Sequence, residues 1–166
     1  MDNLDLIFIF LLVLGAFIGL VFGIFMHEMG HAFAARLNSW AITKIILGAG
    51  PVLLQTRKRD NFPEIELRLI PRSGVVFAKI PASATKLQRL RFVSGGVFVN
   101  FILLLLGLVS YFLTDALSVY SGFWLEFAFV QLFLMGSLWP RYGMINGKKL
   151  KSDGLQIWHI VRDTKV

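Results

Sequence analysis

The sequence His27-Glu28-Met29-Gly30-His31 follows a long uncharged stretch that runs from Leu6 to Met26. Two histidines four residues apart on an α-helix face the same side, about 6 Å apart along the axis, so both can reach one Zn²⁺. The glutamate between them projects beside that ion and can take a proton from an activated water molecule. The pattern therefore predicts a zinc site with His27 and His31 as ligands and Glu28 as the catalytic base.

The uncharged stretch is long enough to cross a membrane, because about 20 residues rising about 1.5 Å each match a hydrocarbon core of roughly 30 Å. Ionisable side chains that continue such a helix are costly unless they are paired, ligated or hydrated, which favours a functional site. The alternative is that they form the polar flank where the helix leaves the membrane. The stretch lacks a positive n-region and exceeds the usual 7–15 residues of a signal peptide core, so we expect it to be retained.

The composition indicates an integral membrane protein. Of 166 residues, 56% are hydrophobic and only 16% are charged, against about a quarter charged in soluble domains. The absence of cysteine excludes disulfides, cysteine-ligated zinc and a thiol nucleophile. We expect an α-helical membrane protein that forms a single domain over residues 1–166. Three transmembrane helices are expected, at about residues 4–38, 92–114 and 119–139.

The distribution of charge predicts the orientation in the membrane. Residues 36–91 carry 11 Lys or Arg against 3 acids, and the tail from Arg141 carries 6 against 2. The short connection Thr114–Gly122 contains Asp115 and no basic residue. The positive-inside rule then places the N-terminus outside and the C-terminus in the cytoplasm, compatible with a bacterial cytoplasmic membrane. The net charge of +7 is thereby explained by topology, and no aromatic-basic patch indicates nucleic-acid binding.

Residues 40–80 read as β-structure between the first and second spans. Alternating polar and apolar residues indicate strands, and clusters of Gly and Pro indicate turns. We expect a small antiparallel sheet associated with the membrane, whose free edge could bind an extended peptide. The expected strands are Ile42–Leu47, Val52–Gln55, Glu64–Leu69 and Val75–Ile80, with turns at Gly48–Pro51 and Pro71–Gly74.

A catalytic zinc needs a third protein ligand and one open position. Asp153 lies in a cytoplasmic segment, residues 150–166, and precedes Gly154, which permits close backbone approach. The other candidates are placed less favourably, either at the outer side, on the solvent face of a strand or as a lone histidine in the last helix. Elimination therefore favours Asp153. The candidates set aside are Asp115 and Glu126 at the outer side, Glu64 and Glu66 in the sheet, and His159.

Three motifs resemble those of the site-2 protease family of intramembrane zinc metalloproteases. H-E-x-x-H at residues 27–31 is the first. Gly96-Val97-Phe98-Val99-Asn100 stands where the family has Gly-Pro-x-x-Asn, with Val97 in place of proline. Asp153-Gly154 matches the end of Asn-Pro-Asp-Gly, with Lys151-Ser152 in place of Asn-Pro.

The resemblance implies one Zn²⁺ per chain, held by His27, His31 and Asp153, with Glu28 as general base. It also implies that Asn100 binds the substrate, which would be a transmembrane or membrane-bound peptide hydrolysed in the bilayer. The alternative is a non-catalytic membrane scaffold, or a degenerate relative that binds transmembrane segments without cutting them.

Overall fold

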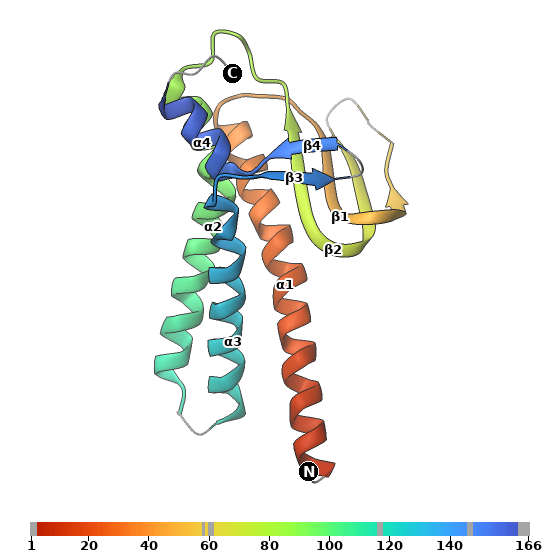
Figure 1. Cartoon of the computed structure of the whole chain (residues 1–166), viewed down its shortest axis with the longest axis vertical. Coiled ribbons are helices and arrows are strands. Elements are labelled where there is room, and N and C mark those ends of the chain that lie inside the picture. Colours follow the sequence, from red (N-terminus) through yellow and green to blue (C-terminus); the bar gives the residue numbers. More distant parts are fainter. Residues whose placement is uncertain (1–2, 58, 60–61, 116–117, 146–147, 163–166) are drawn as a thin grey trace.

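The computed structural model describes residues 3–57, 59, 62–115, 118–145 and 148–162. Over this part of the chain a helical bundle carries a β-rich head, and the start of α1 lies at the far end of the bundle from α4 (Figure 1). The elements follow in the order α1 (Asn3–Leu37), β1 (Ile42–Gln55), β2 (Glu64–Ala78), α2 (Lys86–Leu113), α3 (Val119–Leu134), a 3₁₀ turn η1 (Met135–Leu138), β3 (Tyr142–Ile145), β4 (Lys148–Lys151) and α4 (Asp153–Val161).

The long first helix confirms the prediction to within one residue at each end. Its 35 residues contain no proline and extend about 52 Å, so the helix continues well beyond the length that crosses a bilayer. It ends where Ser39 adopts a positive φ of 57° and the Trp40 amide bonds back to the carbonyl of Ala35. The metal-binding pattern is therefore carried on the last third of a continuous helix.

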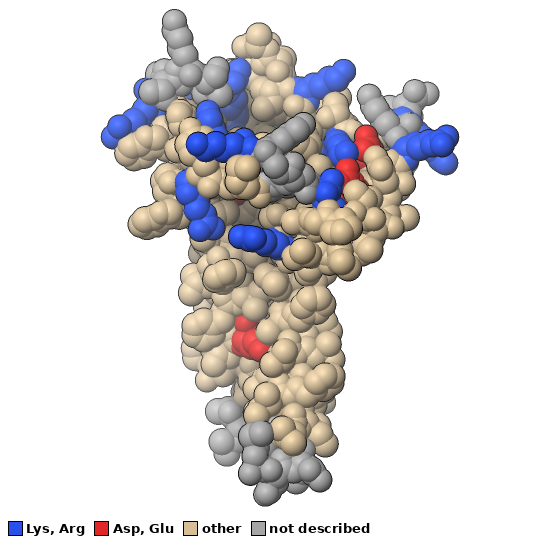
Figure 2. Space-filling model, turned by 45° about the vertical axis from the view of Figure 1, so that its right-hand side comes forward, with Lys and Arg blue, Asp and Glu red and all other residues tan. Residues whose placement is uncertain are grey.

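Three helical segments of the described chain are long and apolar enough to cross a membrane: Leu6–Leu37, Lys86–Leu113 and Tyr120–Leu138. Their outer surfaces are apolar, and the lower half of the molecule carries almost no Lys or Arg (Figure 2). The chain is an integral membrane protein, as the composition predicts. The second helix begins earlier than the expected span because a capping box of Thr85 and Gln88 starts it at Lys86. Exposed side chains on these helices include Phe10, Phe98, Phe112 and Phe133.

Glycines bring the three long helices together. Gly15, Gly19 and Gly23 of α1 face side chains of α3. Gly30 of α1 meets Gly95 of α2 so closely that a Cβ on either residue would overlap the backbone of the other. Without side chains at this crossing, α1 and α2 approach at the level of the H-E-x-x-H motif.

The head contains a sheet of two long, bent strands. The predicted four short strands are wrong, because β1 and β2 each continue through the expected turns. Gly48 and Gly50 have φ values of 92° and 80°, which bend β1 without ending its pairing. The register shifts repeatedly, and Ile45 has partners in both halves of β2, Ile65 and Val76. The sheet itself, between the first and second long helices, is as predicted.

The sequence places Glu66 on the solvent face of a strand, but in the structure this carboxylate is buried. Glu66 is 3% exposed, and Lys44 Nζ lies 2.6 Å from its Oε2. Arg68 forms a second ion pair with Glu66, and Lys44 also lies 2.7 Å from Glu64. Alternation alone misplaced Glu66, because the bent strand turns that side chain toward two cations.

The chain between α3 and α4 forms a hairpin that the sequence analysis did not predict. Pro140–Gly147 reads as a break rich in turns, yet β3 and β4 pair in antiparallel register from Tyr142 and Lys151 to Ile145 and Lys148. Four-residue strands with three lysines in β4 give only a weak periodic signal. The hairpin leads directly into α4, which carries Asp153.

A hydrophobic core lies where the head meets the bundle. Its buried members come from α1, β1, β2, α2 and α4 and from Trp40 after α1, and therefore fix these elements around the end of the H-E-x-x-H helix. The core consists of Ala32, Ala35, Trp40, Ile45, Val76, Phe92, Val93 and Ile160.

Candidate metal centre

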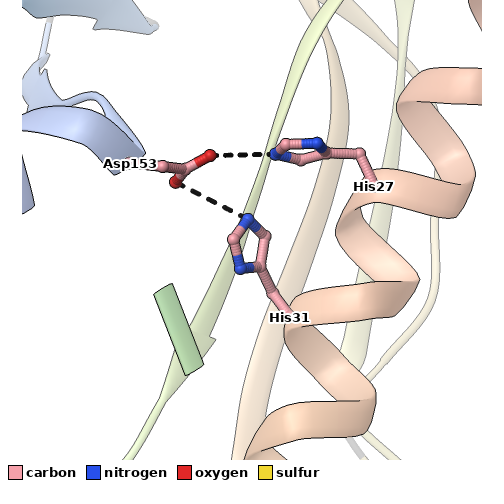
Figure 3. A group of neighbouring side chains, drawn as sticks. All are labelled: His27, His31 and Asp153. Atoms are coloured by element: carbon pink, nitrogen blue, oxygen red, sulfur yellow. Dashed lines mark hydrogen bonds and ion pairs between the residues drawn. The ribbon is translucent and has the colours of Figure 1, made fainter. Parts of the chain in front are cut away.

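The structure brings His27, His31 and Asp153 together, although 122 residues separate His31 from Asp153 along the chain. His27 Nε2 lies 3.0 Å from Asp153 Oδ2, and His31 Nε2 lies 3.6 Å from Asp153 Oδ1. One possible ligand atom from each residue falls within 4.8 Å of the others. Figure 3 shows the two imidazoles projecting from α1 toward the carboxylate at the start of α4.

The two histidine rings are held on one face of α1, as the four-residue spacing requires. Their centroids are 4.9 Å apart, with the rings near perpendicular. His31 Nδ1 donates a hydrogen bond of 2.8 Å to the backbone carbonyl of Phe92 in α2. This bond fixes the ring so that Nε2 is left to face Asp153, the usual way in which a second partner orients a metal-binding histidine.

Gly96 lets α2 lie directly against both imidazoles. A Cβ at this position would come 2.5 Å from His31 Nε2 and 2.6 Å from His27 Nε2, closer than real side-chain contacts. The sequence identified Gly96 only as part of a motif. Its physical role is to leave room for the two imidazoles, which no local pattern could have shown.

Asp153 is the first residue of α4, and the helix start fixes its backbone. The Ser152 side chain caps the helix by accepting a hydrogen bond from the Leu155 amide. Burial by itself would raise the pKa of the Asp153 carboxyl, but hydrogen bonds from His27 and His31 hold that pKa below its ordinary value. Asp153 is therefore a carboxylate at neutral pH, the form in which it can bind a cation.

Glu28 lies beside the cluster and is only 4% exposed. Its Oε2 atom has no hydrogen-bond partner among the described residues. Gly74 of β2 packs against the side chain so closely that a Cβ there would overlap the Glu28 carboxylate. Strand β2 therefore covers the predicted base, a neighbour that the sequence did not indicate.

The donor set fits zinc. Two imidazole nitrogens and one carboxylate oxygen match the ligand types of catalytic zinc sites. Zinc bonds of about 2 Å place tetrahedral ligand atoms roughly 3.3 Å apart, and the distances of 3.0 and 3.6 Å lie on either side of that value. The three residues could supply three ligands, which would leave a fourth position for water or substrate.

The remaining candidates from the sequence lie outside this cluster. Asn100 is fully buried on α2, one helical turn beyond Gly96, and both atoms of its side-chain amide lack a hydrogen-bond partner among the described residues. The Glu126 carboxylate instead faces Gly15, twelve residues before His27 on α1. His159 is in α4 but does not belong to the metal-binding group formed by the described residues.

Comparisons with known proteins give one family and two bacterial relatives. The family model "Peptidase family M50" matches residues 15–159. A Clostridium perfringens protein named "Putative zinc metalloprotease" is 27% identical over 110 residues, which are 60% of this chain and 30% of that protein. A Synechocystis protein of the same name is 35% identical over 101 residues, 51% of this chain and 27% of that protein. The matched segments thus span less than a third of either relative.

Proposed function

Because this chain belongs to peptidase family M50, the site-2 protease family that its motifs resemble, we propose that it is an intramembrane zinc metalloprotease. Its reaction would be hydrolysis of a peptide bond in a transmembrane or membrane-bound peptide. The observation that carries the proposal is the convergence of His27, His31 and Asp153 beside a buried glutamate. This group lies where an apolar helix bundle meets the head of the molecule.

In this proposal His27, His31 and Asp153 hold one zinc ion per chain. When bound, zinc supplies Lewis acidity toward a water molecule and toward the oxygen of the scissile carbonyl. The carbonyl of Phe92 keeps the His31 ring oriented during this chemistry, because it accepts the hydrogen bond from Nδ1.

Glu28 moves the proton. Its carboxylate accepts a proton from the attacking water as the new C–O bond forms, and it then passes that proton to the leaving nitrogen as the C–N bond breaks. The Oε2 atom suits this role, since no described residue engages it. Gly74 against the Glu28 side chain limits the access of bulk water from that side.

The substrate class follows from the surroundings of the site. Apolar helix surfaces surround the bundle, so a peptide reaching the site from the bilayer must itself tolerate hydrocarbon. Asn100 would bind the exposed backbone of that peptide. This role is supported by a fully buried amide whose donor and acceptor match those of a peptide group and are unused by the described residues.

The orientation proposed from charge places the N-terminus outside and the metal centre toward the cytoplasmic side. The bacterial origin of both relatives supports a bacterial cytoplasmic membrane as the location. The positive side chains gather on the head that would face the cytoplasm (Figure 2).

The test measures zinc per chain in detergent-purified protein and then hydrolysis of a library of fluorogenic single-span peptides. We expect about one zinc in the wild type and in Glu28→Gln, and little in His31→Ala or Asp153→Ala. His159→Ala is the matched control and should keep its zinc. Glu28→Gln should reduce hydrolysis by about 100-fold or more.

Two results would contradict the proposal. If wild-type protein prepared without chelator contains no zinc, the proposed metal centre is wrong. A wild type that binds zinc and these peptides but cuts none of them would favour the scaffold alternative.

A further inference from the structure

The hydroxyl of Ser152, the residue before Asp153, joins the start of α4 to the stretch of chain that follows η1. Its Oγ donates a hydrogen bond of 2.8 Å to the carbonyl of Trp139, which ends η1. The same atom accepts hydrogen bonds from the Arg141 amide at 3.1 Å and from the Leu155 amide at 3.3 Å. We propose that Ser152 is a positioning residue that places the Asp153 carboxylate for metal binding, an inference that rests on the proposed zinc site.

The three bonds use the hydroxyl fully. A serine hydroxyl has one donor and two acceptor positions, and here all three are engaged by backbone groups. An ordinary N-cap serine needs only one acceptor position, the one that Leu155 occupies. The bonds to Trp139 and Arg141 are thus additional to helix capping, and they tie α4 to the chain that follows α3.

Backbone contacts on both sides of Asp153 reinforce this connection. The Ser152 amide donates to the Arg141 carbonyl at 2.9 Å. On the other side, Gly154 packs so closely on the Leu138 carbonyl that a Cβ there would overlap it. Residues 152–154 are therefore held against residues 138–141, and Asp153 lies between the two attachments.

The exact position of Asp153 matters more than that of an ordinary residue at a helix start, because Asp153 is a proposed metal ligand. Metal ligands must lie within about 0.2 Å of their required distances, and loss of a supporting partner typically weakens metal affinity about 10- to 100-fold. The other end of α4 is anchored separately, through Ile160 in the core and the bond from Lys86 Nζ to the Val161 carbonyl. Loss of the Ser152 hydroxyl should thus leave α4 docked while its ligand end moves.

The backbone angle of Ser152 supports the same role. Its φ of −64° is close to the value of about −65° that a proline ring imposes. In this chain hydrogen bonds, rather than a proline ring, fix the backbone of the residue that precedes Asp153.

The experiment compares zinc dissociation constants of full-length protein in detergent for wild type, Ser152→Gly, Ser152→Ala and Ser152→Thr. Glycine caps a helix nearly as well as serine, so Ser152→Gly separates the connection to residues 139 and 141 from capping itself. We expect zinc binding to weaken about tenfold or more in the glycine and alanine variants. Threonine keeps the hydroxyl and should restore affinity close to that of the wild type.

Ser118→Ala is the matched control, because Ser118 caps α3 by accepting a hydrogen bond from the Ser121 amide and lies far from the proposed metal centre along the bundle. It should lower thermal stability of the metal-free protein without changing zinc affinity. The absorption spectrum of bound Co²⁺ should change in Ser152→Gly and not in Ser118→Ala, because only the former moves a ligand.

Wild-type affinity and an unchanged Co²⁺ spectrum in Ser152→Gly would overturn the positioning role. The proposed metal site would still hold in that case, provided that His31→Ala loses zinc while the Ser152 variants keep it. If Ser152→Ala does not fold, Ser152→Gly decides the question. Wild-type protein without zinc affinity would instead overturn the proposed function, and this inference with it.

Discussion

At the scale of single residues, the proposed metal centre depends on positions that have no side chain. Gly96 touches both imidazoles, and Gly74 touches the carboxylate of Glu28. In each case a neighbouring backbone occupies the space that a Cβ would need. The chemistry-bearing side chains are thus enclosed by main chain from α2 and β2, which limits how far they can move.

Gly96→Ala should weaken zinc binding, because its methyl group would collide with His27 and His31. We expect affinity to fall about 10- to 100-fold, as when a supporting contact of a metal ligand is lost. Zinc titration of the purified variant measures the effect. Gly122→Ala is the control, since no atom of the described residues lies within 4 Å of a Cβ built there. Unchanged zinc affinity in Gly96→Ala would show that α2 can move away from the His27 and His31 rings without disturbing the site.

At the scale of elements, the bent sheet is held by a cluster of opposite charges. Lys44 of β1 bridges Glu64 and Glu66 of β2, and Arg68 pairs with Glu66 from the same strand. Hydrogen bonds from Lys44 hold the pKa of both carboxyls below the ordinary value, and the same bonds raise the pKa of Lys44. Because β2 also covers Glu28, this cluster links the stability of the sheet to the surroundings of the proposed base.

The lowered carboxylate pKa values predict a loss of stability in acid. A carboxyl with a depressed folded pKa contributes stability above its unfolded pKa of about 4.5, and the contribution disappears as pH falls through the folded pKa. Metal-free wild type should therefore lose more thermal stability between pH 6 and about 3 than Glu66→Gln does. Thermal unfolding in detergent at several pH values measures this difference.

Lys44→Met provides the check on this prediction. If the effect comes from the Lys44–Glu66 pair, the double variant Lys44→Met with Glu66→Gln should show no more pH dependence than either single variant. Equal acid sensitivity in the wild type and in Glu66→Gln would assign the acid transition to other groups.

At the scale of the whole molecule, charge and apolarity are separated along the long axis. Lys and Arg gather on the head, while the bundle surface in view has an acidic patch and is otherwise uncharged (Figure 2). Its exposed side chains are largely hydrophobic. The connection between α2 and α3 lies at the opposite end from the hairpin and α4 (Figure 1). This distribution supports a single orientation across a membrane.

The absence of cysteine makes that orientation directly measurable. Asp115→Cys at the end of the bundle should react with a membrane-impermeant maleimide in intact bacterial cells. Met144→Cys in the hairpin, where the native side chain is 68% exposed, should react only after the cells are opened. The cysteine-free wild type is the blank for both. The reverse labelling pattern would place the head and the metal centre on the outer side.

Much of the architecture could be predicted from the sequence, because its signals are local. A long uncharged stretch predicts a spanning helix whatever its neighbours are, and four-residue spacing places His27 and His31 on one face by helix geometry alone. The three long helices and the sheet between the first two were predicted in this way. So was Asp153 as the candidate third ligand, although its role in binding zinc stays a prediction.

The tertiary structure decided what depends on contacts between distant segments. In the structure Glu66 is buried in an ion pair, and β1 and β2 continue through the expected turns. A hairpin also precedes α4. The tertiary structure also placed Gly74 on Glu28 and tied Ser152 to Trp139. Local periodicity cannot show which backbones meet, because those meetings arise from packing between elements far apart in the chain. The sequence by itself determined which residues could bind a metal, and the fold decided what surrounds them.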